Sequence, residues 1–467
     1  MTRLGRTALP SLHGVRTPAY DPSGVTVGVV HLGVGAFHRA HQAVYTDAVL
    51  AADPTWGISG FTQRSAAVRD QLAPQDGLYT VLERGAGAAP PQVIGALREI
   101  HTPDACGGPA ARIADPRVRL VTLTVTEKGY RFAGGHLDLT DPFVRADLAT
   151  FPQPPTRSAV GRLVAGLELR RRADAGPISV LSCDNLPANG ATLRGLVADF
   201  CAALPAGDRL MDWIAASVAF PSCVVDRIVP STTAADLAAV AAALGVRDEG
   251  AVVAEPFTQW VIEDTFAAGR PAWETAGAVF TADVAPYEAA KLRLLNATHS
   301  LLAYTGALAG HDTIAAAMTD PVLADAARRL MTEDAAPTLT LPDGFDLPGY
   351  QESVLRRFAD PALGHRTAQV AADGSLKLPI RLLGTARDRL AAGGTPQWTA
   401  LAVAAWMVYV ATRGPVDDPL AETLAAAADA SSAASLVDSL LPVLPSPPDP
   451  VWRDLLVAHA GRLLHDN

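Results

Sequence analysis

The apolar residues of the N-terminal part of the chain fall into short runs rich in Val and Ile, with longer stretches of helical periodicity between them. The stretch 158–176 predicts a helix, and the runs that predict strands are 25–30, 56–62, 78–84, 91–100, 118–130 and 177–182. Strands that alternate with helices are typical of βαβ units. The pattern therefore predicts an α/β domain with a mostly parallel sheet.

The pattern changes near Pro286. Strand-like runs give way to helical segments rich in Ala and Leu, which continue to the end of the chain. We therefore expect two domains, 1–285 with the sheet and 286–467 mainly α-helical, which suits a length of 467 residues. The most apolar run, 398–411, falls short of the roughly 20 residues that span a bilayer and predicts a buried core helix.

Composition narrows the classes of protein. The formal net charge is −10, which argues against nucleic acid or an anionic membrane as the main partner. The four cysteines form no C-x-x-C pair, so a disulfide scaffold or a zinc ribbon is not expected. The first residues contain no long apolar segment of the kind that forms a signal peptide. We expect a cytoplasmic protein.

A Gly-x-Gly turn, formed by Gly33 and Gly35, follows the first predicted strand and precedes a helical pattern. Such a turn lets the backbone approach a pyrophosphate, and the N-terminus of the next helix favours negative charge. His38 stands where the dinucleotide fingerprint has its third glycine. The alternative is a tight turn from strand to helix that binds no ligand.

The second predicted strand ends in Gln63, Arg64 and Ser65. An Asp or Glu usually binds the ribose 2′-hydroxyl of NAD at this point. Without that carboxylate, Arg64 is either the residue that accepts the 2′-phosphate of NADP or an ordinary exposed arginine. The sequence leaves the choice between NAD and NADP open.

Asn185 follows a buried strand, in the segment SCDNLPANG. Crevices beyond the carboxyl ends of the strands are where open α/β sheets bind ligands. An amide at such a place can donate a hydrogen bond to a developing alkoxide. The alternative is a plain turn, because Asn, Pro and Gly all favour one.

The segment 287–304 predicts a helix that carries Lys291, Asn296 and His299 among apolar residues. A buried lysine can lose its proton and act as a general base. On an α-helix Lys291 and Asn296 lie about 140° apart, so the three side chains span a broad arc. The alternative is a core helix whose lysine reaches out to water and whose histidine is an ordinary core residue.

The segment 357–383 is rich in basic side chains, namely His365, Arg366, Lys377 and Arg381. Such donors suit a substrate that has many hydroxyl groups or a carboxylate. The alternative is a basic surface loop.

A metal site is not expected. His31, His38 and His41 are close in sequence, but His31 lies on a predicted strand and the other two on the following helix. No Cys or acidic residue stands at a recognisable ligand spacing. The chain also lacks the G-x-S-x-G nucleophile motif of a serine hydrolase.

The chain resembles the mannitol dehydrogenase family of polyol-specific long-chain dehydrogenases from about residue 25 to about residue 460. The segments that carry the resemblance, in the order of that family, are GVGAFHRAHQAVYTD, TVTEKGY, SCDNLPANG, FPSCVVDRIVP and KLRLLNATHSLLAY. The resemblance implies a Rossmann-like N-terminal domain, a mainly helical C-terminal domain and hydride transfer without a metal. The segment 365–381 is similar to the fructuronate reductase branch, which acts on a sugar acid.

The resemblance also implies roles for individual residues. The implied catalytic residues are Lys291, Asn296, His299 and Asn185. The residues expected to bind the cofactor are Gly33, Gly35, Ala36, Phe37, Arg64, Thr126 and Glu127. The residues expected to contact the substrate are Asp226, His365, Arg366 and Lys377.

The implied reaction transfers hydride, with NAD or NADP, between a secondary alcohol of a polyol or aldonate and its ketose or keto-acid. Lys291 is the implied base, the two asparagines hydrogen-bond the oxygen that gains charge, and His299 orients the substrate or the lysine. The implied partner is a small sugar alcohol or sugar acid, and we expect a monomer or a small homo-oligomer. A mannitol-1-phosphate 5-dehydrogenase and a non-catalytic NAD(P) sensor are the alternatives.

Overall fold

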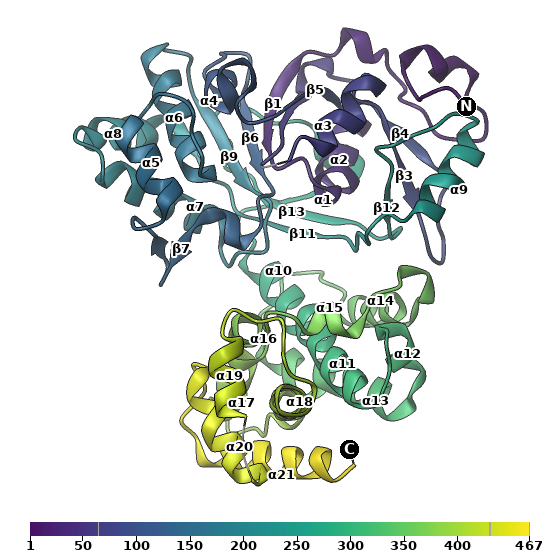
Figure 1. The fold of residues 1–467 in the computed structure, drawn as a ribbon, viewed down its shortest axis with the longest axis vertical. Coiled ribbons are helices and arrows are strands. Elements are labelled where there is room, and N and C mark those ends of the chain that lie inside the picture. Colours follow the sequence, from purple (N-terminus) through teal and green to yellow (C-terminus); the bar gives the residue numbers. More distant parts are fainter. Residues whose placement is uncertain (64, 429–430, 467) are drawn as a thin grey trace. The chain divides into compact units, whose positions relative to one another are not determined.

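The computed structural model describes residues 1–63, 65–428 and 431–466. The chain divides into two compact units, Met1–Val284 and Ala285–Asn467. Every strand of the described chain belongs to the first unit, and the second unit consists of helices (Figure 1). The predicted fold class, a parallel α/β unit followed by a mainly helical one, is confirmed.

The first unit is built on a six-stranded parallel sheet with the strand order β10-β9-β6-β1-β2-β5. Its strands are β1 (Val27–Leu32), β2 (Gly57–Phe61), β5 (Leu97–His101), β6 (Leu120–Leu123), β9 (Ile178–Ser182) and β10 (Val218–Ala219). This is the order of a doubly wound Rossmann sheet, and the strand order reverses between β1 and β6.

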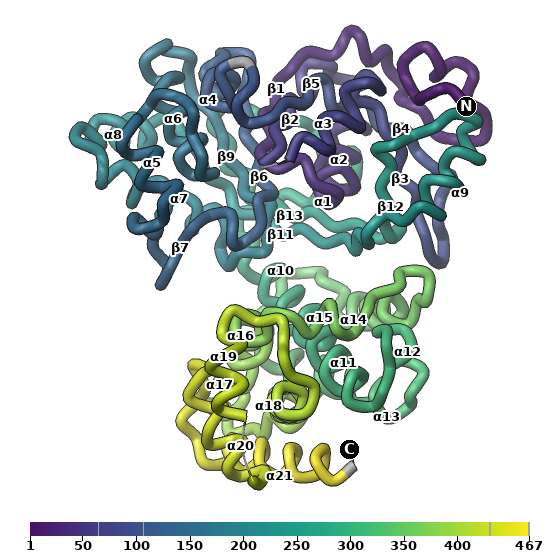
Figure 2. Tube along the Cα trace, viewed as in Figure 1, coloured from purple at the N-terminus to yellow at the C-terminus, as the bar shows by residue number. Residues whose placement is uncertain are grey.

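Helices cover both faces of this sheet, so its strands are apolar on both sides. Val30 packs with residues of α4, α6 and α7, whereas its neighbour Val29 packs with residues of α2. The helices of the unit are α1 (Ala36–Ala40), α2 (Gln42–Val49), α3 (Ala67–Leu72), α4 (Gly108–Ile113), α5 (Pro142–Thr150), α6 (Ala159–Arg172), α7 (Asn189–Ala202), α8 (Gly207–Ser217) and α9 (Ala234–Leu244). The N-terminal segment lies beside α9 (Figure 2). Leu4 donates its N–H to the carbonyl oxygen of Arg247, which follows this helix, at 2.8 Å.

Three smaller sheets complete the first unit. They comprise β3 (Tyr79–Glu83), β4 (Gln92–Ile94) and β12 (Val252–Ala254); β11 (Cys223–Asp226), β13 (Gln259–Glu263) and β14 (Val279–Thr281); and β7 (Phe132–Ala133) with β8 (His136–Leu137). The run 91–100, predicted as one strand, forms β4 and β5 in two different sheets. It breaks at Gly95, whose N–H is donated to the buried Asp47 carboxylate at 2.7 Å instead of to a neighbouring strand.

The second unit begins with one continuous helical stretch, α10 (Ala285–Ala290), η8 (Lys291–Asn296) and α11 (Ala297–Leu308), whose middle part η8 is a π-helix. Two further π-helical segments are η9 (Leu330–Ala335) and η12 (Pro379–Leu383). The other helices are α12 (Ile314–Thr319), α13 (Pro321–Arg329), α14 (Leu347–Ala359), α15 (Thr367–Ala371), α16 (Gly374–Leu378), α17 (Gly384–Ala391), α18 (Gln397–Arg413), α19 (Ala421–Ala427), α20 (Ala433–Leu440) and α21 (Pro450–Asp466).

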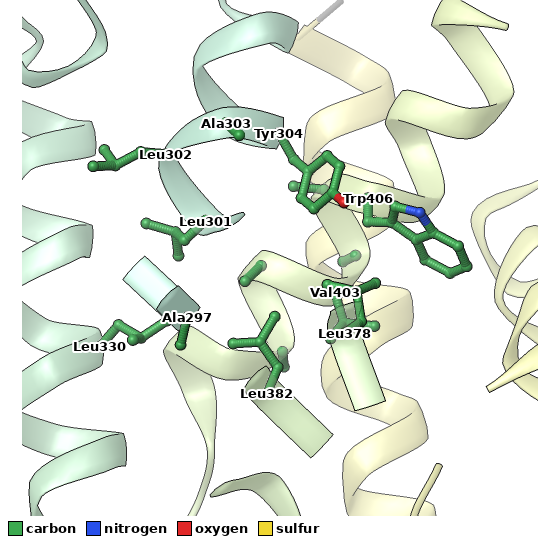
Figure 3. Packing of buried hydrophobic residues seen from close by; sticks show 14 of the residues in the cluster. Ala297, Leu301, Leu302, Ala303, Tyr304, Leu330, Leu378, Leu382, Val403 and Trp406 are labelled. Atoms are coloured by element: carbon green, nitrogen blue, oxygen red, sulfur yellow. The ribbon is translucent and has the colours of Figure 1, made fainter. Parts of the chain in front are cut away.

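The core of this unit forms around α11 and α18. Ala297 and Leu301 of α11 share one apolar cluster with Leu330 and Leu382, and the same cluster includes most of α18 (Figure 3). The run 398–411 is thus a buried core helix, as predicted. Among the described residues, no helix combines the length and apolar character needed to cross a membrane.

Candidate active site

The glycine turn between β1 and α1 is held tightly by its neighbours. Gly33 donates its N–H to Phe61 O at 2.8 Å, and its carbonyl accepts a hydrogen bond from Thr124 Oγ1 at 2.7 Å. The φ of Gly33 is +104°, and a Cβ at this position would stand 2.0 Å from Thr124 O. The turn therefore requires glycine, because no side chain fits between the ends of β1 and β6.

Gly35 has a different role in the same turn. Its backbone is extended, with φ −91° and ψ −177°, which any residue can adopt. A Cβ at Gly35 would meet only Gly33 O, at 3.8 Å, so one side of the residue faces open space. That open side allows a ligand to approach the backbone closely, as a pyrophosphate does in dinucleotide-binding proteins.

His38, which replaces the third glycine of the fingerprint, stacks on His31 with the ring centroids 3.4 Å apart. His31 Nδ1 lies 2.8 Å from Thr122 Oγ1, and His31 Nε2 lies 3.0 Å from Gly33 O. Burial lowers the pKa of His31 to about 3 against the opposing effect of the Gly33 carbonyl, so the ring is neutral. The stacked rings occupy the space in which a third glycine usually lets helix and strand pack closely.

A cavity of about 960 Å³ opens at the C-terminal ends of β1, β2 and β6. Its lining includes Gly33, Gly35, Gln63, Ser65, Thr126 and Arg162. It lies where the strand order reverses, which is the place at which doubly wound sheets bind dinucleotides. Its volume and the open side of Gly35 fit a dinucleotide whose pyrophosphate lies against the turn.

The residues predicted to bind the cofactor fall into two groups. Both glycines of the turn and Thr126 line the cavity. Ala36 begins α1, the partly buried Phe37 follows it, and Glu127 begins a short 3-10 helix; none of these three is part of the cavity wall that the structure describes. Arg64 lies outside the described residues.

Asp184 shapes the wall of this cavity. Its carboxylate accepts hydrogen bonds from the N–H groups of Val125 and Thr126, both at 2.9 Å, and from the Tyr130 hydroxyl at 2.7 Å. These bonds hold Thr126 at φ +64°, which is uncommon for a residue other than glycine. Burial raises the pKa of Asp184 to about 6, although the bonds it accepts oppose this. The sequence motif pointed to Asn185 and gave its neighbour Asp184 no role.

Asn189 is a second residue of that segment that was not predicted to have a role. Its Oδ1 accepts the N–H of Cys223 at 2.9 Å, and its Nδ2 donates to Cys223 O at 2.8 Å. These two bonds fix the start of β11 beside the loop that carries the exposed Asn185. Asp226, a predicted substrate contact, is buried at the other end of β11. The segment makes a turn at residues 187–188 before α7 begins at Asn189.

The helix predicted over 287–304 is present, but Lys291–Asn296 forms the π-helix η8 within it. In a π-helix hydrogen bonds join residues five apart, so each residue stands over the one five positions earlier. Lys291 and Asn296 are five positions apart and therefore share one face. The separation of about 140° applies to an α-helix, and the π-helical turn replaces that geometry here. Single π-helical turns occur frequently at functional sites.

His299 follows η8 in the first turn of α11. Its ring stacks on the ring of His365, at 5.2 Å between centroids, and on that of Phe358, at 4.9 Å. Its Nε2 is buried and has no hydrogen-bond partner among the described residues. A buried imidazole nitrogen without a partner is rare in folded proteins and marks a place where a ligand group fits.

The surroundings of His299 are strongly basic. Burial holds the pKa of His299 well below its ordinary value, and the charges that lower it further come from His365, Arg381, Arg357 and Lys377. Arg381, on η12, donates from Nη1 to Ser300 Oγ at 3.1 Å, directly beside His299. A neutral imidazole surrounded by cations favours an anionic or strongly polar ligand.

The remaining predicted substrate contacts differ in their positions. Lys377 donates from Nζ to Ala372 O at 2.6 Å, so a carbonyl at the end of α15 already holds its ammonium group. Arg366 is exposed just before α15. Of the two neighbours His365 and Arg366, the structure brings only His365 against the ring of His299.

In the part of the chain that the structure describes, no group of three or more His, Cys, Asp or Glu side chains is arranged to hold a metal ion. The two units nevertheless contain the parts of one kind of enzyme. A doubly wound unit with a dinucleotide-sized cavity, and a helical unit that carries a lysine and an asparagine on one π-helical face, define an NAD(P)-dependent dehydrogenase.

Comparison with known proteins identifies the family. The Rossmann domain of mannitol dehydrogenase matches residues 27–275, and the mannitol dehydrogenase C-terminal domain matches residues 283–443. D-mannonate oxidoreductase of Escherichia coli (strain K12) is 45% identical over 417 residues, which cover 88% of this chain and 84% of that protein. Mannitol 2-dehydrogenase of Pyrenophora tritici-repentis is 38% identical over 442 residues, which cover 91% and 78%.

A solved structure agrees with these relatives. Pseudomonas fluorescens mannitol 2-dehydrogenase, in a ternary complex with NAD and D-mannitol, has a TM-score of 0.89 and 36% identity, with 100% of this chain and 97% of that chain covered. The chain belongs to the mannitol dehydrogenase family. It is an oxidoreductase that acts on CH–OH groups with a nicotinamide cofactor, so the family and the reaction class predicted from the sequence are confirmed.

Proposed function

We propose that the protein interconverts an aldonate of the mannonate type and its keto-acid, with Lys291 as the general base. The observation that carries the proposal is the basic environment of His299, next to the π-helical face that presents Lys291 and Asn296. The 45% identity to a D-mannonate oxidoreductase supports the same substrate class. A polyol such as mannitol is the second candidate, because other relatives are mannitol 2-dehydrogenases.

Each side chain of the proposed site has its own role in the hydride-transfer reaction. Lys291 accepts the proton of the substrate hydroxyl at Nζ during oxidation and returns it during reduction. The amide of Asn296 donates a hydrogen bond to the substrate oxygen as it gains negative charge. The neutral His299 uses its buried Nε2 to hold a second hydroxyl and orient the sugar chain. The bound dinucleotide supplies the hydride acceptor, as either NAD or NADP.

Arg381 is the residue best placed to bind the carboxylate of an aldonate. Its planar guanidinium carries several N–H donors, and its Nη1 donates to Ser300 Oγ directly beside His299. It acts on His299 more strongly than Arg357 or Lys377 does. An arginine can bind a carboxylate through two parallel hydrogen bonds, which fixes orientation as well as charge.

A cofactor-reduction screen tests the proposed function. The panel consists of mannonate, altronate, mannitol, arabinitol, sorbitol and mannitol 1-phosphate, each with NAD and with NADP. We expect turnover with mannonate, and a kcat/KM at least about tenfold above that for mannitol, because only the aldonate uses a charge-assisted hydrogen bond. Turnover of mannitol alone would place the protein among the polyol dehydrogenases. Cofactor binding without turnover of any compound would favour a sensor.

Replacement of Arg381 tests the carboxylate contact. Arg381→Met should raise KM for mannonate roughly 10- to 100-fold and leave kcat/KM for uncharged mannitol within about threefold. The matched control is Arg356→Met, which removes an exposed arginine on α14. Steady-state kinetics with both substrates measure the effect. Equal losses for mannonate and mannitol would mean that Arg381 only supports the fold.

A further inference from the structure

A buried arginine stands in the wall of the dinucleotide cavity. Arg162, in the first turns of α6, is only 5% exposed and lines the cavity. Its Nε donates to Thr156 O at 3.1 Å, and its Nη1 donates to Gln63 Oε1 at 2.8 Å. Asp147 and Asp104 act on it electrostatically, but no described carboxylate forms an ion pair with it.

A buried guanidinium in the wall of this cavity favours the binding of an anion. Removing a charge from water is costly unless an opposite charge or several hydrogen bonds compensate. Two carbonyl-type acceptors use two of the five N–H donors of Arg162, which leaves donors for a ligand in the cavity. The nearest candidate anion in a dinucleotide site is a phosphate.

The contact between Arg162 and Gln63 indicates which phosphate group of a dinucleotide Arg162 would bind. Gln63 is the second residue after β2, and at the end of this strand NAD enzymes usually hold the ribose 2′-hydroxyl with a carboxylate. Here the Oε1 of Gln63 is occupied by Arg162, and its buried Nε2 has no partner among the described residues. The pyrophosphate, in contrast, belongs at the Gly33 turn.

The side chains that line the cavity near Gln63 are mainly hydrogen-bond donors. Ser65 Oγ accepts the N–H of Ala67 at 3.1 Å, which leaves its hydroxyl hydrogen available to a ligand. The acid in the same wall is Asp104, which is exposed on the loop after β5. A 2′-phosphate accepts several hydrogen bonds and brings negative charge, whereas a 2′-hydroxyl brings no charge to balance a guanidinium.

We propose that Arg162, oriented by Gln63, binds the 2′-phosphate of NADP and gives this chain a preference for NADP over NAD. This inference rests on the proposed nicotinamide-dependent function and names the cofactor for it. It also explains why the end of β2 carries an amide where a carboxylate is usual. Gln63 serves as the positioning residue, and Arg162 contacts the cofactor.

Binding titrations test the proposal without turnover. The change in fluorescence of NADPH and of NADH on mixing with the full chain gives a Kd for each, and the parent should bind NADPH at least about tenfold more tightly. Arg162→Met should weaken NADPH roughly 10- to 100-fold and change the Kd for NADH less than about threefold. Arg172→Met, on the same helix but paired with Glu168, is the control and should leave the ratio of the two Kd values unchanged.

A second variant keeps the proposal testable if Arg162→Met does not fold. Gln63→Glu places a carboxylate against the guanidinium and should reverse the preference toward NADH. Equal binding of NADH and NADPH by the parent, or equal weakening of both in Arg162→Met, would overturn the cofactor preference alone. Failure of the parent to bind either dinucleotide would overturn the proposed function together with it.

Discussion

Lys291→Met is expected to lower kcat by roughly 10²- to 10⁴-fold, which is the range that a positioned general base contributes. Methionine keeps the length and apolar stem of the buried lysine, so the core of the helical unit stays filled. Only the amine that accepts the alcohol proton is removed. Steady-state kinetics should show the loss in kcat, while fluorescence titration should give a Kd for the reduced cofactor within about twofold of the parent.

The control for this result lies on the same π-helix. Arg293 carries a cation on η8 but pairs with Asp388 of α17 at 2.6 Å, so Arg293→Met should cost stability without a large loss of kcat. Small primary amines added to Lys291→Ala, in which the shortened side chain leaves room for them, should restore part of the rate because they replace the missing base. A normal kcat in Lys291→Met would remove the lysine from the proposed mechanism.

The sequence predicted the fold well because its signals are local and repeated. Buried strands of a parallel sheet consist almost entirely of Val, Ile and Leu, and each is followed by a helix. The break at Gly95 was not predictable in this way, because it depends on a hydrogen bond to Asp47, a residue distant in sequence. Long-range contacts likewise decide which strands belong to the main sheet, and a local sequence pattern does not predict them.

The helix that carries Lys291 and Asn296 shows a different limit of prediction from sequence. Its existence followed from periodicity, but the π-helical geometry of η8 did not, because the residues of a π-turn have ordinary helix propensities. The geometry changes the chemical meaning of the motif. A spacing of five separates two side chains on an α-helix and brings them together on a π-helix.

The basic residues of the segment 357–383 show most clearly that sequence alone does not predict which side chains meet in the fold. The segment 357–383 contains several cations, and the family resemblance pointed to His365, Arg366 and Lys377 as substrate contacts but not to Arg381. The structure places Arg381 beside His299, because the π-helical segment η12 packs against η8, and leaves Arg366 exposed. In the same way, Arg162 is about 100 positions from Gln63 in sequence, and only the fold joins them.

Gly33→Ala should strongly destabilise the sheet-containing unit. A Cβ at this residue would stand 2.0 Å from Thr124 O, and φ of +104° is a conformation that alanine rarely adopts. Strain and displacement of the backbone together should lower the free energy of unfolding by about 3–5 kcal/mol. Urea denaturation followed by circular dichroism measures the loss, and a stability equal to that of the parent would contradict the geometry of the turn.

Gly35→Ala separates the stability of the turn from its role in binding. The added Cβ would meet nothing closer than Gly33 O at 3.8 Å, and the extended backbone suits alanine, so stability should remain within about 0.5 kcal/mol of the parent. The methyl group would, however, stand where the pyrophosphate approaches the backbone, and cofactor binding should weaken by roughly tenfold. Unchanged binding in a stable Gly35→Ala protein would mean that the pyrophosphate lies elsewhere in the cavity. The two glycines thus differ in their surroundings, because Gly33 fills the narrow gap between β1 and β6 whereas Gly35 has open space on one side.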